Sequence, residues 1–385
     1  MVEAVLLLGI AASVFVGFNI GGSSTGIAWG PPVGAEVLRK STAAGLMTAF
    51  VFLGGWTVGR NVMDTLGEDV ITIEISLGAG VAILFFIGVG ILVANLVGVP
   101  VPTSMTTVGS IVGLGLATGT TDFATVGWIL SWWLVTPVIG FWIGASIGRY
   151  IYPELSRRVQ LEVSEGPLFT FDRSGIVPRV TLGPNSTWRE VGGTSGVLVI
   201  GCYMAFSAGA SNVPNAAAPL VSGGALEADL AIVLATAAIS LGGFTIARRT
   251  MRSVGTELSD IPLLGALIVM VTAATLTTAL SWIGVPISLV LGSVSTIVGL
   301  GWGRATRPIA ARDVVVGDLE ADIEPAALTV DPDAPAKIGD PEPEEVLDAG
   351  DLFKPAAVFT YVSMWIVGPT LSTLLAFLYF SLVPV

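Results

Sequence analysis

Long uncharged runs alternate with short charged connections along the whole chain. Several of these runs exceed the roughly 20 apolar residues that a helix needs to cross about 30 Å of hydrocarbon. The pattern therefore predicts an all-α polytopic membrane protein with about 10–12 membrane segments, some of them half-length. The uncharged runs cover residues 4–35, 41–59, 75–121, 124–148, 191–226, 230–247, 261–303 and 355–385.

Glycine, proline and small polar residues interrupt the apolar pattern at Gly17–Gly26, Gly98–Thr107 and Gly209–Ala216. Within lipid every freed backbone N–H and C=O group needs a partner, so such a segment is tolerated only where protein or a watery cavity covers it. Paired interruptions are typical of transporter sites built from discontinuous helices. We therefore expect broken, re-entrant helices at these places.

The second half of the chain repeats the first. Gly98-Val99-Pro100 recurs as Gly284-Val285-Pro286, and Ile111–Gly115 recurs as Ile297–Gly301, both 186 residues further on. Counting crossings with most arginines inside leaves mainly Arg60 outside and gives the halves opposite orientations. We therefore expect an inverted-topology repeat of two halves. The predicted divisions are a first membrane repeat at 1–148, a polar connecting loop at 149–190, a second repeat at 191–303, an acidic, proline-rich loop at 304–354 and a final transmembrane helix at 355–385.

Composition supports this class and excludes several kinds of chemistry. The 385 residues are 53% hydrophobic and 12% charged, with a mean hydropathy of +0.83. The chain contains no histidine and one cysteine, which leaves little for a metal centre, haem ligation or a catalytic triad. We expect no cofactor, no bound metal, no nucleic-acid partner and no enzyme activity. The net charge of −12 lies outside the membrane segments, a bias that resembles adaptation to a salty cytoplasm.

The interrupted segments carry no Asp, Glu, Lys or Arg, so helix ends, amides and hydroxyls must hold any bound ion. A helix N-terminus offers unpaired N–H groups and about half a positive charge, which suits an anion. Any one hydroxyl is more often a packing residue, but the paired clusters together favour a site. Asp64 and Glu257 are candidates for proton coupling, although solvated surface is their ordinary interpretation. The candidate substrate residues are Asn19, Gly22, Ser23, Ser24, Thr25, Thr103, Ser104, Ser211, Asn212, Asn215 and Ser288.

Three segments carry a resemblance to a known family. Gly17-Phe18-Asn19 and Gly209–Leu220 resemble copies of the duplicated GANDxANxxGP signature of the inorganic phosphate transporter (PiT) family, and Gly98–Ser104 resembles its GxPVSTTH element. The resemblance covers nearly the whole chain and implies a dimeric inverted-repeat transporter that holds an oxyanion between paired broken helices. In this alignment the signature's aspartate becomes Ile20 in the first copy and Asn212 in the second. These departures look closer to the sulfate permease branch of the family and count against sodium coupling.

The missing carboxylates favour sulfate as the substrate. Sulfate only accepts hydrogen bonds, whereas phosphate near neutral pH still carries a proton that a carboxylate would accept. The sequence therefore predicts a secondary transporter of the cell membrane that moves sulfate by alternating access, with proton coupling favoured over sodium. Inorganic phosphate is the alternative substrate. The rival functions are an anion channel, a membrane enzyme and a transport-inactive sensor, of which the enzyme is disfavoured. The expected partners are the anion, the coupling ion, the lipid membrane and a second copy of the chain.

Overall fold

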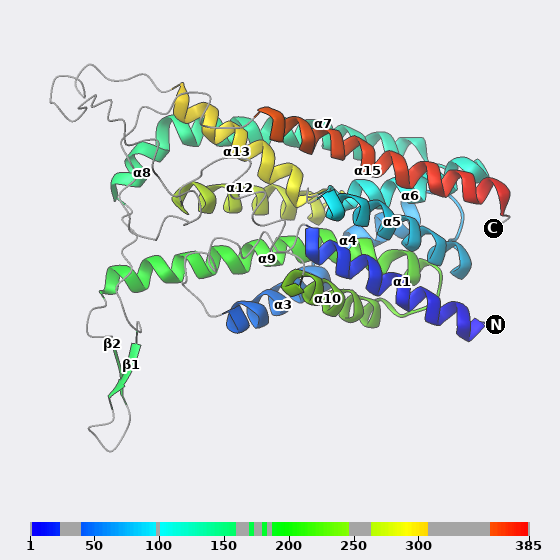
Figure 1. Ribbon diagram of the computed structural model, residues 1–385, viewed down its shortest axis with the longest axis horizontal. Coiled ribbons are helices and arrows are strands. Elements are labelled where there is room, and N and C mark those ends of the chain that lie inside the picture. Colours follow the sequence, from blue (N-terminus) through cyan, green and yellow to red (C-terminus); the bar gives the residue numbers. More distant parts are fainter. Residues whose placement is uncertain are drawn as a thin grey trace.

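The computed structural model describes residues 2–23, 40–97, 101–158, 169–172, 179–182, 187–245, 263–306 and 355–383, which are almost entirely helical (Figure 1). The helical elements of the first half are α1 (Val2–Ser23), α3 (Lys40–Trp56), α4 (Gly59–Asp64), the π-helical turn η2 (Thr65–Asp69), α5 (Leu77–Val97), α6 (Thr103–Thr118), α7 (Phe123–Ser146), the π-helical turn η3 (Ile147–Ile151) and α8 (Tyr152–Arg158). Those of the second half are α9 (Trp188–Ser222), α10 (Ala228–Thr245), α12 (Leu263–Trp282), α13 (Leu289–Ala305) and α15 (Pro355–Leu382). Between the halves, the short strands β1 (Phe169–Asp172) and β2 (Arg179–Leu182) form an antiparallel hairpin.

Seven of the described helices are long and apolar enough to cross a membrane. The pair formed by α3 and the α4–η2 segment makes an eighth span if its 59° bend is taken as one broken crossing. The prediction of a helical, multi-pass membrane protein is confirmed. The bend after α3 is a broken helix at a place where the sequence suggested no break.

Helices from the two halves pack against each other in reciprocal pairs. In the first bundle α1 packs along α10 and α3 along α9, and in the second bundle α6 packs along α15 and α7 along α13. Since α9 repeats α1 and α10 repeats α3, the two pairs of the first bundle are counterparts of each other. The helices α5 and α12 contact both bundles and stand between them (Figure 1). Each bundle is therefore built from both repeats, as an inverted repeat requires.

Four glycines permit the close packing of the first bundle and fix the register between the halves. A methyl group added to Gly21 would strike the backbone of α10, and one added to Gly209 would strike the backbone of α3. The same holds on the partner helices. A methyl group added to Gly242 would strike the backbone of α1, and one added to Gly54 would strike the backbone of α9. Gly21 therefore corresponds to Gly209 and Gly54 to Gly242, each pair being 188 residues apart.

This packing register pairs Gly21 with Gly209, one helical turn away from the match of Gly17 to Gly209. The alignment of Gly17-Phe18-Asn19 with the family signature, which places the signature's aspartate on Ile20, stays a prediction. In the register that the packing fixes, Asn212 corresponds to Ser24. The stretch is rich in glycines, so the sequence pattern alone offered several equivalent starting points. Neither copy carries a carboxylate in either register.

One predicted break is absent, and another falls partly outside the described residues. α1 stays helical through Gly17–Ser23, and the rest of that predicted break, Ser24–Gly26, lies outside the described ranges. Gly209–Ala216 lies within α9, which remains helical despite Pro214. Proline is tolerated in a membrane helix where neighbouring elements cover the backbone group that it leaves free. Here that group is the carbonyl of Ala210, which faces the backbone of α4.

The predicted break at Gly98–Thr107 is confirmed between α5 and α6. The repeat of its Gly-Val-Pro element, at Gly284–Pro286, lies in a second break, between α12 and α13. α5 ends at Val97 and α6 begins at Thr103, while α12 ends at Trp282 and α13 begins at Leu289. The two Gly-Val-Pro elements lie in these gaps. Gly284 has φ +78°, a left-handed conformation that glycine adopts without strain. Paired broken segments therefore lie at α5–α6 and α12–α13, whereas α9 is continuous over Trp188–Ser222.

An ion pair between Arg60 on α4 and Asp229 on α10 places these two residues at the same end of the molecule. The chain termini lie at one end of the helices in Figure 1, and α8 lies at the other. This agrees with the crossing count, which put Arg60 and the segment at 225–229 on the outer side.

Candidate functional site

Two buried helix N-termini meet where the Gly-Val-Pro breaks end. α6 begins after Pro102 and α13 begins after Ser288, and no side chain caps either N-terminus. The Ser104 hydroxyl donates to the carbonyl oxygen of Ile287 at 3.0 Å, which joins the two ends directly. Backbone N–H groups and the positive ends of two helix dipoles therefore converge on one buried region.

Two asparagines of α9 reach the first turn of α6. Thr103 Oγ1 donates to Asn212 Oδ1 at 2.8 Å. Asn215 Nδ2 donates to the hydroxyl oxygens of Thr103 and Ser104, at 3.3 and 3.2 Å. It also donates to the Ser211 carbonyl oxygen at 3.1 Å. All these side chains are buried, being at most 1% exposed. We define the amide–hydroxyl cluster as Thr103, Ser104, Ser211, Asn212, Asn215 and Ser288.

Within the described ranges, two polar atoms of the amide–hydroxyl cluster lack a hydrogen-bond partner, Asn215 Oδ1 and Ser288 Oγ. A buried polar group without a partner costs about 1–3 kcal/mol. Proteins retain few such groups, and a bound ligand, ion or water is a usual explanation. The cluster is therefore incomplete by itself, and its unpaired atoms are one amide acceptor and one hydroxyl.

α1 contributes a neighbouring set of contacts. The Ser23 hydroxyl accepts from the backbone N–H of Val101 at 3.2 Å, two residues before α6 begins. Asn19 lies one turn earlier, where its carbonyl and amide oxygens accept from Asn95 Nδ2 at 3.0 and 3.1 Å. Gly22 is buried on the same helix. These residues thus flank the α5–α6 break, with Asn19 held by α5.

Asn95 was missed by the sequence analysis. It is a lone amide near the end of the otherwise apolar α5, and that contrast is the signal that would have found it. Its Oδ1 atom is buried and has no hydrogen-bond partner among the residues that the structure describes.

The remaining candidates do not join the cluster. Asp64 is exposed at the end of α4. Ser24, Thr25 and Glu257 lie outside the described residues. The structure therefore brings together the second-repeat residues and the α6 hydroxyls most closely, with Ser23 beside them.

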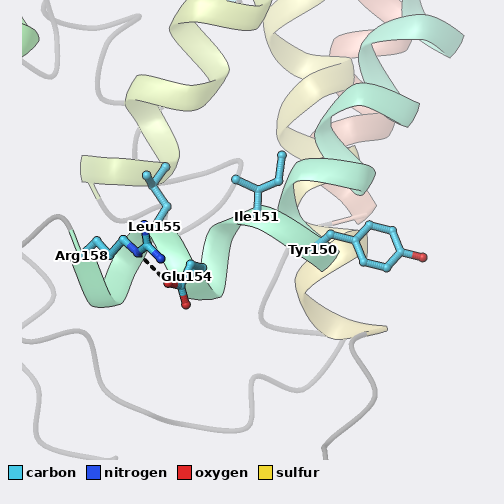
Figure 2. Close-up of a pocket in the computed structure, with 5 residues that line it drawn as sticks. All are labelled: Tyr150, Ile151, Glu154, Leu155 and Arg158. Carbon is cyan, nitrogen blue, oxygen red and sulfur yellow. Dashed lines mark hydrogen bonds and ion pairs between the residues drawn. The ribbon is translucent and has the colours of Figure 1, made fainter.

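Two cavities lie away from the amide–hydroxyl cluster. The first, of about 300 Å³, is lined by residues of η3 and α8 and is drawn in Figure 2. The second, of about 460 Å³, lies between η3–α8, α9 and α12. No cluster residue lines either cavity. With its side chains at most 1% exposed, the cluster is closed to solvent in this conformation.

The chain is similar in sequence to known anion transporters. Residues 20–376 match the model of the phosphate transporter family. The chain is 28% identical over 311 residues to the sulfate permease CysP of Bacillus subtilis, covering 80% of each chain. It is 23% identical over 399 residues to the chloroplastic inorganic phosphate transporter 2-1 of Arabidopsis thaliana, covering 81% of this chain and 67% of that one.

A solved structure supports the same fold. The sodium-dependent phosphate transporter superposes with a TM-score of 0.66 over 98% of this chain and 99% of that chain. The sequence identity is 17%, so this likeness concerns the fold alone.

Proposed function

The chain belongs to the phosphate transporter family, and we propose that it is a secondary transporter that carries sulfate across the cell membrane by alternating access. It is a multi-pass membrane protein and an anion transporter of that family. The main observation in favour of sulfate is the amide–hydroxyl cluster. It is buried at two helix N-termini, and none of its residues is a carboxylate.

A neutral, donor-rich site suits a fully deprotonated oxyanion. Backbone N–H groups at the starts of α6 and α13, the side-chain amides and the hydroxyls supply donors without a basic side chain. The signature's aspartate position is Asn212 in the second copy and Ile20 in the first, and Ser24, the counterpart of Asn212 in the packing register, is no carboxylate either. Both copies therefore lack the group that would accept a phosphate proton. The similarity to a sulfate permease of Bacillus subtilis supports the same choice.

Inorganic phosphate is a second candidate, and one atom favours it. Asn215 Oδ1 is a buried acceptor without a partner. An amide oxygen at this place would accept the proton of monohydrogen phosphate, whereas sulfate has no proton to donate. Competition between the two anions separates these candidates.

The position of the cluster supports a rocking mechanism. Thr103 and Ser104 belong to the second bundle, while Asn212 and Asn215 belong to the first. Their hydrogen bonds therefore cross from one bundle to the other, at the closed site. In our proposal the bundles rock about this contact and expose the anion to each side in turn. A site closed to solvent in this way favours a carrier over an anion channel.

Proton coupling is proposed in preference to sodium because both copies of the signature lack the aspartate. With no histidine in the chain, the proton carrier would be Asp64, Glu257 or the anion itself. Asp64 lies exposed on α4, where solvent can reach it. We further propose that the transporter works as a homodimer in the membrane, as the family resemblance implies.

Uptake of labelled sulfate into proteoliposomes tests the proposal. We expect sulfate uptake that an imposed proton gradient drives, that a sodium gradient leaves unchanged and that phosphate inhibits weakly. Phosphate uptake that requires sodium would overturn both the substrate and the coupling ion. Flux that no gradient affects, at rates beyond those of a carrier, would favour the channel.

A further inference from the structure

An apolar groove runs between η3–α8, α9 and α12. It lies at the arginine-rich end of the molecule, which we define as the end where Arg149, Arg158 and Arg189 lie. Its volume is about 460 Å³, within the range of roughly 300–1,000 Å³ that is common for small-molecule sites. One wall consists of Ile147, Ile151 and Leu155, which lie four residues apart and so share one face of η3 and α8. A second wall is the apolar start of α12, from Leu264 to Thr272. Thr272 is the only residue with a polar side chain among those that line the groove.

The third wall is a stretch of α9 that glycines make flat. Gly192, Gly193 and Gly196 line the groove, followed by Val197 and Ile200 deeper along the helix. A methyl group added to Gly192 or Gly196 would meet no atom within 4 Å. Gly192 and Gly196 therefore border open space among the described residues, in contrast to the glycines of the helix contacts, where a methyl group would strike a backbone.

Two arginines lie at the same end of the groove, one on α8 and one on α9. Arg158 lies one turn beyond Leu155 on α8, and Arg189 lies one turn before Gly192 and Gly193 on α9. The Arg189 guanidinium donates to the Arg158 carbonyl oxygen at 2.8 Å, so the two helix ends are in contact. The smaller cavity, of about 300 Å³, shares Ile151 and Leu155 with the groove and extends to Arg158 (Figure 2).

Among the described residues, the charges of Arg158 and Arg189 are only partly compensated. The Arg158 side chain is 76% exposed and pairs with Glu154 at 2.6 Å (Figure 2). Arg189 is exposed, and its hydrogen bond goes to a neutral carbonyl. An apolar channel of this kind with a positive rim matches a molecule that has an alkyl chain and an anionic head. Basic pockets between membrane helices on the arginine-rich side bind anionic lipid head groups in this way.

We propose that the groove binds one anionic phospholipid, with an acyl chain along Gly192 and Gly196 and the phosphate at Arg158 and Arg189. The binding is independent of which anion the protein transports. The arginine-rich end faces the cytoplasm by the positive-inside rule, and anionic lipids are enriched in that leaflet. Glu154 competes with the lipid phosphate for Arg158, so it weakens the binding.

Native mass spectrometry of the full chain in detergent, titrated with phosphatidylglycerol or phosphatidylcholine, tests the proposal. We expect one phosphatidylglycerol to bind more tightly than phosphatidylcholine. Gly196→Leu places a side chain in the groove and should weaken phosphatidylglycerol binding about tenfold, as the loss of two buried methylenes would. Gly127→Leu on α7 is the matched control, since a methyl group there also meets no atom within 4 Å.

Substitutions at the rim test the head-group contact separately. Arg158→Gln and Arg189→Gln should each reduce the preference for phosphatidylglycerol about fivefold, while Glu154→Gln should increase it. Equal lipid binding by Gly196→Leu and Gly127→Leu variants, or an unchanged preference in both arginine variants, would overturn the proposal. A change in the monomer–dimer ratio of Gly196→Leu without any change in lipid binding would also overturn it, by assigning the groove to a contact between copies. Thermal unfolding of each variant identifies any that fail to fold, and the rim variants then provide the test.

Discussion

Thr103 on α6 donates its hydroxyl to the side-chain oxygen of Asn212 on α9, across 109 positions of the chain and between the two bundles. Both side chains are buried, so this bond contributes to stability and also holds the bundles in the closed arrangement. A rocking movement of one bundle against the other must break it. In the proposed mechanism, an anion that takes its place must then supply acceptors for the freed hydroxyl.

The first prediction concerns this hydroxyl. Thr103→Val keeps the shape of the side chain but removes the donor to Asn212 and one acceptor of Asn215. Leaving buried partners unpaired costs about 1–3 kcal/mol, so we expect sulfate uptake to fall at least about tenfold. Uptake into proteoliposomes, normalised to the amount of folded protein, measures the effect.

Thr103→Ser is the control, because it keeps the hydroxyl and loses one methyl group. We expect it to retain most of the uptake. If the valine and serine variants transport equally well, the hydroxyl at this position serves packing alone.

The second prediction concerns the close helix contact in the first bundle. Gly54→Ala on α3 would drive a methyl group into the Phe206 carbonyl oxygen, and backbone atoms on α9 cannot move aside as a flexible side chain can. Overpacking of this kind costs about 1–3 kcal/mol, so the unfolding temperature in detergent should fall. Gly45→Ala on the same helix meets no atom within 4 Å and should leave the unfolding temperature unchanged or raise it. Equal stability of both variants would contradict this packing of α3 against α9.

The Gly-Val-Pro elements were read correctly from the sequence because proline and glycine together end a helix by local chemistry. Gly209–Ala216 misled the same reasoning, since Pro214 and the small residues around it remain helical when neighbouring helices cover them. Local composition does not contain that tertiary support. The sequence predicted that Asn215 and Thr103 belong to one site. It could not predict the hydrogen bond between them, because that bond depends on how α9 packs against α6.

The third prediction concerns orientation. In a variant with Cys202→Ala, the only native cysteine is removed. Asp229→Cys in that background should react with a membrane-impermeant thiol reagent in intact cells, whereas Arg158→Cys should react only after the membrane is opened. Both native side chains are well exposed, 60% and 76%, so access to the reagent depends on the side of the membrane. The reverse pattern would invert the proposed topology.

The fourth prediction concerns coupling. Asp64 is an exposed carboxylate at the end of α4, the short helix that follows the bend after α3. Asp64→Asn removes the titratable group with little change in size. If this residue carries the proton, the variant should lose stimulation by an imposed proton gradient while still exchanging sulfate for sulfate at equilibrium. Full stimulation in the variant would leave Glu257 or the anion as the proton carrier.

The last prediction concerns substrate choice. Asn212→Asp keeps the oxygen that accepts from Thr103 and exchanges the amide donor for a second, charged acceptor. The new charge repels sulfate, which offers no proton. Monohydrogen phosphate can donate its proton to the carboxylate, and a hydrogen bond to a charged group contributes about 1.5–3 kcal/mol. The ratio of phosphate to sulfate uptake should therefore rise at least about tenfold.

Asn212→Ala separates this effect from simple damage to the site. The alanine variant loses donor and acceptor together, so it should lower the uptake of both anions without favouring phosphate. If the aspartate variant lowers both anions equally, Asn212 does not contact the substrate, and the selectivity must arise elsewhere. The unpaired Asn215 Oδ1 would then be the acceptor to test, because it is the buried cluster atom that a phosphate proton could still reach.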